Sequence, residues 1–178
     1  MRNRLRVLPI LLALGPSLLA WAGCESSTKP PTTKRNQKPL QEDARRVLDA
    51  AERLVLFSIE GEGDGVPEST DTSFHGFKIL GKTEIANPPE RQQLLSALYQ
   101  GIDEANDGGA LCFVPRHGIR AAVGDETVDL VICFECSHIE VFGKQKTLSL
   151  TSSSPASAFN AALERAGVPL AKPPGIQH

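Results

Sequence analysis

The sequence predicts an α+β fold, a single antiparallel sheet of about 4–6 strands with two or three helices packed on one face. Three observations lead to this prediction. Apolar residues recur at three- and four-residue spacing near residues 40–51, 88–102 and 155–166, which is the period of amphipathic helices. Between residues 110 and 151 apolar residues alternate with polar ones, which is the period of half-buried strands. The span 40–170 has the length of one domain with one core.

The domain is expected to open with a helix and a strand. The buried stripe of this helix consists of Leu40, Ala44, Val47, Leu48 and Ala51. From Leu54 the run "LVLFSI" predicts either a short strand or the buried end of the same helix. The Gly- and acid-rich stretch 60–73 predicts a solvated loop, because its carboxylates lack the spacing of a calcium-binding loop. Residues 74–85 then predict a strand pair, or one strand bent at Gly81.

A second helix is expected to begin after Asn87. Asn87 can cap its N-terminus, Pro88 suits the first turn, and Glu90 interacts favourably with the helix dipole. The run "NDGG" at residues 106–109 ends it. Its buried stripe consists of Leu94, Leu95, Leu98 and Ile102.

An antiparallel meander of three or four strands and a last helix are expected to complete the domain. The meander is predicted over residues 110–123, 127–136, 137–142 and 146–151, with the turns "GDE" and "GKQ" between strands. Ser154 is expected to cap the last helix, Pro155 to start it, and Gly167 with Pro169 to end it.

The N-terminus has the three-part layout of a bacterial secretory signal peptide, expected over residues 1–23. Three arginines precede an apolar run, and small residues follow it. The run "WAGC", residues 21–24, resembles the lipobox of bacterial lipoproteins, in which a lipid is attached to the cysteine. Trp21 departs from that motif, which has an aliphatic residue at this position. The resemblance implies a lipid anchor on Cys24 and a periplasm-facing location in the bacterial cell envelope.

The segments at the two ends of the domain are polar and rich in proline. Residues 24–39 are predicted to be a disordered tether and residues 171–178 a disordered tail. By the same resemblance, Glu25 after the lipid-bearing cysteine favours the outer membrane. The formal net charge of −2 becomes −5 once the leader, with three arginines and no acidic residue, is removed. An acidic chain without a basic stripe argues against binding to nucleic acid, so membrane attachment rests on the lipid.

Three cysteines remain in the domain once Cys24 carries a lipid. These are Cys112, Cys133 and Cys136. An odd number cannot pair completely, so at least one thiol is free, metal-bound or linked to another chain. Neighbouring cysteines in an oxidising envelope normally form a disulfide. The expected bond joins Cys112 to Cys133 or Cys136 across neighbouring strands, and this structural disulfide is the favoured interpretation.

A zinc site is the main alternative. His117 completes the pattern C-x4-H-x15-C-x2-C, and His138 offers a fifth donor. Three sulfurs and one imidazole satisfy tetrahedral zinc. Cys133 and Cys136 reach one metal only if the chain turns at Phe134-Glu135, where neither Gly nor Pro favours a turn. Inert buried thiols, and redox or nucleophilic thiol chemistry, are further alternatives.

Two arginines form a weaker candidate site for an anion. Alternation puts Arg116 and Arg120 on one face of the predicted strand, where two guanidinium groups can bind a carboxylate or a phosphate. The favoured alternative is that they pair with Glu135 or Glu140 on a facing strand.

Two stretches around the cysteines carry a resemblance to a family. "CFVPRHGIRA" followed by "VDLVICFEC" resembles an uncharacterised family of bacterial secreted or lipid-anchored proteins, in which a Cys-x-x-Pro-Arg-x-x-Ile strand precedes a Cys-Phe-x-Cys strand. The resemblance implies that these cysteines form one constellation and implies no activity. We therefore expect a lipid-anchored envelope protein with a non-catalytic binding or structural domain and no cofactor. A zinc-binding or thiol-redox protein is the competing expectation.

Overall fold

The computed structural model describes residues 39–61, 71–106 and 112–172. The predicted signal peptide, Cys24, the tether up to residue 38, the middle of the acidic loop and the end of the tail lie outside the described residues.

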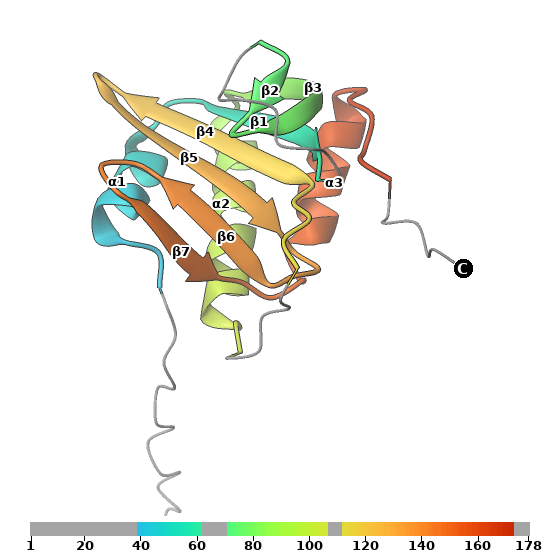
Figure 1. Ribbon diagram of the computed structural model, residues 1–178. Coiled ribbons are helices and arrows are strands. Elements are labelled where there is room, and N and C mark those ends of the chain that lie inside the picture. Colours follow the sequence, from blue (N-terminus) through green and yellow to red (C-terminus); the bar gives the residue numbers. More distant parts are fainter. Residues whose placement is uncertain (1–38, 62–70, 107–111, 173–178) are drawn as a thin grey trace, which may run out of the picture. The chain divides into compact units, whose positions relative to one another are not determined.

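The described residues form an α+β domain with a single antiparallel sheet, as predicted, but the sheet has seven strands (Figure 1). The two stretches for which the sequence left alternatives open both form strands. Residues 54–59 lie in one strand, and residues 74–85 belong to a strand pair. In chain order the elements are α1 (Glu42–Ala50), β1 (Leu54–Glu60), β2 (Ser73–Phe74), β3 (Phe77–Ile85), α2 (Pro88–Asp103), β4 (His117–Val123), β5 (Glu126–Cys133), β6 (His138–Phe142), β7 (Lys146–Leu150) and α3 (Ala156–Arg165).

The strand order is β2-β3-β1-β4-β5-β6-β7, and every pair is antiparallel. β1 lies between β3 and β4, so the chain must pass from β3 across β1 to reach β4. Helix α2 makes this connection. The three helices lie behind the sheet in Figure 1, and the face toward the viewer is the open face.

The sheet is curved into half of a barrel. The β1–β3 register shifts between Ser58 and Ile59, and such a bulge increases local twist. The curvature carries the β2–β3 turn over the open face toward strands that are distant in the strand order. The ring of Phe74 lies against Gly118 of β4, where an added Cβ would be 2.6 Å from the ring. His75 reaches Asp129 of β5 and stacks on Phe142 of β6.

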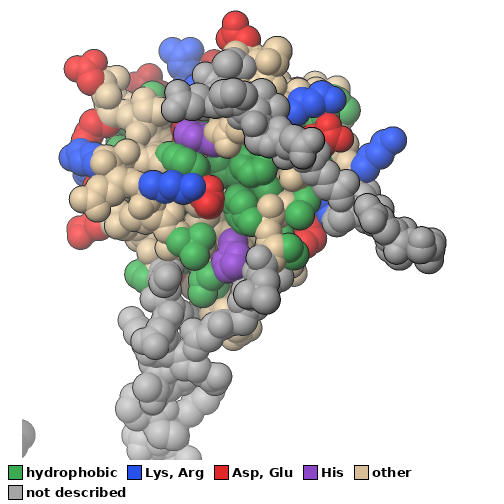
Figure 2. Space-filling model, viewed as in Figure 1, with side chains coloured by type: hydrophobic (Ala, Val, Ile, Leu, Met, Phe, Trp, Pro, Cys, Tyr) green, Lys and Arg blue, Asp and Glu red, His purple; other side chains and the backbone are tan. Residues whose placement is uncertain are grey.

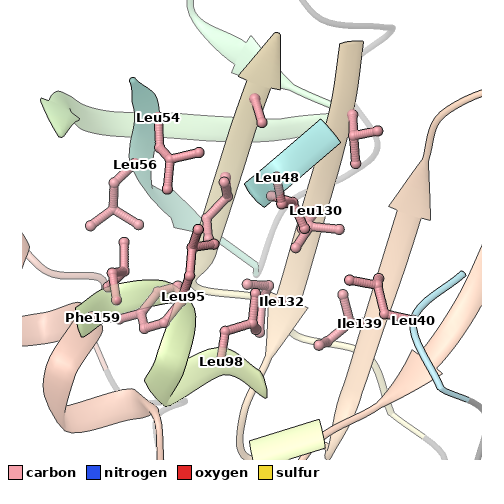
Figure 3. Packing of buried hydrophobic residues seen from close by; sticks show 14 of the residues in the cluster. Leu40, Leu48, Leu54, Leu56, Leu95, Leu98, Leu130, Ile132, Ile139 and Phe159 are labelled. Carbon is pink, nitrogen blue, oxygen red and sulfur yellow. The ribbon is translucent and has the colours of Figure 1, made fainter. Parts of the chain in front are cut away.

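The main hydrophobic core fills the space between the sheet and the helices. Figure 3 shows side chains of β1, β5 and β6 that lie among those of α1, α2 and α3, namely Leu54, Leu56, Leu130, Ile132 and Ile139 with Leu48, Leu95, Leu98 and Phe159. A second, smaller cluster lies on the open face and contains Phe57, Ile59, Phe74 and Val131. β1 is therefore covered on both faces, since its residues alternate between the two clusters.

Asn87 and Gly167 act at helix ends as predicted, but α2 already ends at Asp103, before the run at 106–109, and Pro155 precedes α3 as its N-cap instead of starting it. The side chain of Asn87 accepts a hydrogen bond from the backbone N–H of Glu90, and so caps α2. Gly167, which follows the C-cap residue Ala166 and has a φ of +70°, terminates α3. The prediction that Ser154 caps α3 is wrong, because its hydroxyl donates instead to the carboxylate of Glu104 at the end of α2, at 2.7 Å.

The two strands that carry the cysteines are shorter than predicted. β4 begins at His117 rather than residue 110, and β5 ends at Cys133 rather than residue 136. Pro115 has no N–H to donate to a neighbouring strand, which disfavours pairing before His117. The chain turns directly after Cys133, and residues 133–137 are called the cysteine turn below.

Candidate functional site

A disulfide closes the cysteine turn. Cys133 and Cys136 are bonded, with an S–S distance of 2.05 Å and a Cα–Cα distance of 5.1 Å. Cys112 is free and exposed. A disulfide is thus present, but the predicted bond from Cys112 is wrong. The reason is the turn, which folds Cys136 back onto Cys133 and thereby replaces a pairing between strands.

The turn forms without Gly or Pro. Ser137 adopts a φ of +59°, which L-residues rarely take, and its N–H donates to the carbonyl oxygen of Phe134 at 3.3 Å. Thr151, at the end of β7, donates its N–H to the carbonyl oxygen of Ser137 at 3.1 Å. Contacts from a distant part of the chain therefore hold a turn that no turn residue in the sequence indicates.

The predicted zinc ligands are not gathered at one point. His117 points toward α3, where its ring lies against Phe134 and Phe159. Alternation along β5 directs Cys133 to the open face, because its neighbour Ile132 belongs to the main core. His138 is the cross-strand partner of Cys133. In the described part of the chain, no group of three or more His, Cys, Asp or Glu side chains is placed to hold a metal ion.

His117 is a buried polar residue between β4 and α3. Its exposed fraction is 4%, and its Nε2 donates to Oδ1 of Asn160 at 2.8 Å. Its Nδ1 has no hydrogen-bond partner, and neither has the buried hydroxyl of Ser58, its cross-strand partner in β1. Burial lowers the pKa of His117 and outweighs the Asn160 hydrogen bond and the charge of Glu135, which both raise it. The imidazole is therefore neutral in the folded protein at neutral pH.

The buried neutral state of His117 predicts a loss of stability in weak acid. The unfolded chain binds a proton at this side chain below about pH 6.5, whereas the folded protein resists it, so the free energy of unfolding should fall as the pH drops from 7.5 to 5. The limiting slope is about 1.4 kcal/mol per pH unit for one proton. Urea unfolding at a series of pH values measures this slope. His117→Gln should remove it, whereas the control His138→Gln should keep it; an unchanged slope in His117→Gln contradicts the assignment.

The two arginines of the predicted anion site each have an acidic partner. Arg116 lies 3.1 Å from Glu135 of the cysteine turn, which is one of the two pairings predicted for the facing strand. Arg120 pairs with Asp129 rather than Glu140, because the β4–β5 register places these two residues directly opposite each other. The prediction that the two arginines pair with acidic residues on a neighbouring part of the chain is therefore supported. Asp129 is the partner that the sequence analysis did not identify.

Asp129 is the centre of a polar cluster on the open face. Its carboxylate accepts two hydrogen bonds from Arg120, at 2.8 and 2.7 Å, and lies 2.7 Å from Nε2 of His75. Only 5% of Asp129 is exposed. His75 stacks on Phe142 with 3.7 Å between ring centroids and meets Phe74 edge to face. The cluster joins the β2–β3 turn to β4, β5 and β6.

No role could be assigned to His75 from the sequence, because its partners come from three separate strands. The local signal is weak. "FHGF" places His75 and Gly76 between the phenylalanines that pair β2 with β3, and both residues take positive φ, 51° and 85°. That pattern identifies a two-residue hairpin turn. It does not indicate that the curvature of the sheet brings His75 of this turn into contact with Asp129 of β5.

The open face contains a pocket of about 450 Å³ next to this cluster. Its apolar wall consists of Phe57, Phe74 and Ile79, and its charged side chains are Asp71, Lys82 and Arg120. Phe57 and Phe74 stack with ring centroids 4.3 Å apart. Figure 2 shows hydrophobic side chains at the centre of this face with histidine and charged side chains around them. Ser73 also lines the pocket, and because Phe57 and Phe74 are only 3% and 1% exposed, its accessible lining is mainly polar and charged.

A second groove of about 400 Å³ lies between α1 and the turns at the ends of β4 and β6. Ala44, Val47 and Val141 form its apolar part. Its basic residues, Arg46 and Lys144, both pair with Glu126, at 2.8 and 3.2 Å. Arg120 of the open-face pocket is likewise paired, with Asp129, but Lys82 has no acidic partner among the described residues, so we take the open-face pocket as the better candidate site.

The fold and the site define a small α+β protein with a curved sheet, one open face and a disulfide-closed turn. No protein-family model, curated protein or solved structure matches the chain. No described helix combines the length and the apolar character that crossing a membrane requires.

Proposed function

We propose that this protein is a lipid-anchored protein of the bacterial cell envelope whose domain is a non-catalytic binding module. The anchor is the lipid on Cys24, and residues 24–39 link it to the domain. The N-terminal sequence supports this part of the proposal through its basic start, apolar run and "WAGC" motif. The domain faces the periplasm, and the outer membrane is its favoured location.

The observation that carries the binding function is the open-face pocket. The helices cover only the other face of the sheet, so a ligand reaches the pocket without displacing a described element. Its volume of about 450 Å³ is in the range of ligand pockets.

The chemistry of the pocket favours a small ligand with one anionic group. Any apolar part of it would lie against Ile79 and the exposed edges of Phe57 and Phe74. Lys82 is exposed at the pocket, and 39% of the Arg120 side chain is exposed while it binds Asp129. Because Arg120 is paired with Asp129, Lys82 is the lining cation that is left to bind an anionic group.

The binding function can be tested with 8-anilinonaphthalene-1-sulfonate, an anion with an aromatic body. We expect saturable binding that Lys82→Glu weakens at least about fivefold, the effect of a ~1 kcal/mol ion pair in water. Lys146→Glu makes the same change in charge on the same face outside the pocket, and should leave the affinity within about twofold. Fluorescence titration measures both. Equal weakening by the two variants, or no saturable binding, would overturn the pocket as the site.

The anchor is tested independently in bacterial cells grown with labelled palmitate. The wild-type chain should incorporate the label and sediment with membranes. Cys24→Ser should lose both properties, whereas the control Cys112→Ser should lose neither. Label that persists in Cys24→Ser would exclude lipidation at this cysteine.

A further inference from the structure

The free cysteine lies in a segment that is held against the disulfide. The backbone N–H of Val114 donates to Sγ of Cys136 at 3.4 Å. Two residues later, the N–H of Arg116 donates to the carbonyl oxygen of Ile132 at 3.1 Å, and its guanidinium lies 3.1 Å from Glu135. These contacts hold the segment that contains Cys112 beside the cysteine turn.

The three sulfurs differ sharply in access. Cys133 and Cys136 are 1% and 3% exposed, whereas Cys112 is exposed. A dissolved thiol or disulfide can therefore react with Cys112, whereas the buried Cys133–Cys136 bond is shielded from it. Thiol–disulfide exchange requires direct contact between the attacking and attacked sulfurs. The buried disulfide is thus reachable from solution only through a change at the turn or through a cysteine of the protein itself.

We propose that Cys112 is the exchange cysteine of the Cys133–Cys136 disulfide. Its thiolate attacks Sγ of Cys136, a bond forms between Cys112 and Cys136, and Sγ of Cys133 leaves as a thiolate. The electrons balance within the protein, because one disulfide replaces another and no oxidant is consumed. The new disulfide involves the exposed cysteine, so a dissolved thiol attacks Sγ of Cys112 and releases Cys136 as a thiolate, and a second thiol then displaces the first from Cys112 and leaves as the oxidised disulfide.

The direction of attack follows from the hydrogen bonds. Val114 approaches Cys136, so the incoming cysteine is two residues from the sulfur that it attacks. The N–H of Cys136 donates to Sγ of Cys133 at 3.1 Å. A donor at this position stabilises negative charge on the departing sulfur. Sγ of Cys136 also accepts an N–H, from Val114, but at the longer distance of 3.4 Å, so the shorter bond favours Cys133 as the leaving group and the approach of the Cys112 segment favours Cys136 as the target.

The exchange requires the segment that contains Cys112 to move toward Cys136. A disulfide needs about 4.4–6.8 Å between Cα atoms, and two residues of extended chain span at most ~7 Å. Residues 112–115 belong to neither a helix nor a strand, whereas the backbone of Arg116 is hydrogen-bonded to Ile59 and Ile132, so the movement involves only the residues before Arg116. The exchange would place the segment before β4 closer to the turn and free Cys133 on the open face.

The first experiment tests whether Cys112 can form a disulfide with Cys136. It uses the full chain with Cys24→Ser, in detergent and in a glutathione redox buffer. Cys133→Ser leaves Cys112 and Cys136, which we expect to form an intramolecular disulfide. The matched variant Cys136→Ser leaves Cys112 and Cys133, and should form its bond at least about tenfold more slowly. Acid quenching, alkylation and peptide mapping identify the bonds. Equal rates, or no Cys112–Cys136 bond, would overturn the proposal.

A second measurement keeps the native disulfide and so does not depend on how the first variants fold. Cys112→Ser changes only the exposed cysteine. Reduction of Cys133–Cys136 by glutathione should be at least about tenfold slower in this variant than in the parent chain. Equal reduction rates contradict a role for Cys112. Dye binding at the open-face pocket should be unchanged in Cys112→Ser, so the exchange and the binding function succeed or fail separately.

Discussion

Arg120→Met is expected to lower the free energy of unfolding by about 3 kcal/mol, the lower end of the range for breaking a buried ion pair. The carboxylate of Asp129, with 6% of its side chain exposed, would lose two hydrogen bonds and keep only His75. The lower end applies because 39% of the Arg120 side chain is exposed, so solvent screens part of the pair. Urea unfolding, monitored by far-UV circular dichroism, measures the change. Tryptophan fluorescence is not used, because the single tryptophan, Trp21, precedes the domain.

The matched control is the exposed pair between Arg46 and Glu126. Its length is 2.8 Å, but the two side chains are 52% and 38% exposed. Arg46→Met should therefore cost less than about 1 kcal/mol. If both variants lost the same stability, burial of Asp129 would not be the source of the effect.

The Asp129 pair also has a defined pH dependence. Burial alone would raise the pKa of Asp129, but hydrogen bonds from Arg120 and His75 outweigh burial and lower it. Since the folded pKa lies below the unfolded value of about 3.9, the pair contributes fully above about pH 4 and its contribution is lost as the pH falls through the folded pKa. The stability difference between the wild type and Arg120→Met should thus shrink in acid. A difference that is constant from pH 7 to 3 would contradict this.

Phe159→Ala is expected to lower the free energy of unfolding by about 3–5 kcal/mol. Phe159 is fully buried in α3, and its ring packs edge to face on Phe134 at 5.0 Å and on His117 at 5.7 Å between centroids. Truncation leaves a cavity where α3 meets the cysteine turn. The same unfolding experiment measures the loss.

Leu148→Ala serves as the control for this substitution. Leu148 is a large apolar residue with 39% exposure, in the edge strand β7. Its truncation removes little buried surface and should cost less than about 1 kcal/mol. If Phe159→Ala lowered the free energy of unfolding by less than about 1.5 kcal/mol, the Phe159 ring would not be needed to pack α3 against the sheet.

The helices were predictable because their signals are local. Asn87, Pro88 and Glu90 lie within one turn of chain, and the structure starts α2 at Pro88 with Asn87 as its cap. Gly167 likewise ends α3. A capping side chain bonds to backbone groups two or three residues away, so such pairs can be read without knowing the fold.

The strands near β1 were ambiguous for a physical reason. β1 is buried on both faces, so "LVLFSI" shows no polar alternation and reads equally well as the buried end of a helix. Gly101 gives a related example. Glycine weakens a helix interior, but at this position a Cβ would lie 2.4 Å from Cγ of Pro155, in the segment before α3. Only the packing explains why glycine stands there.

The sequence by itself determined the α+β class, the three helices with their buried stripes, and the odd number of cysteines in the domain. These depend on periodicity, caps and composition, which act within a few residues. The tertiary structure alone decided that Cys136 bonds Cys133, that His117 faces α3, and that Asp129 gathers Arg120 and His75. Each of these depends on sheet curvature and strand register, because both bring together side chains that are far apart in the chain.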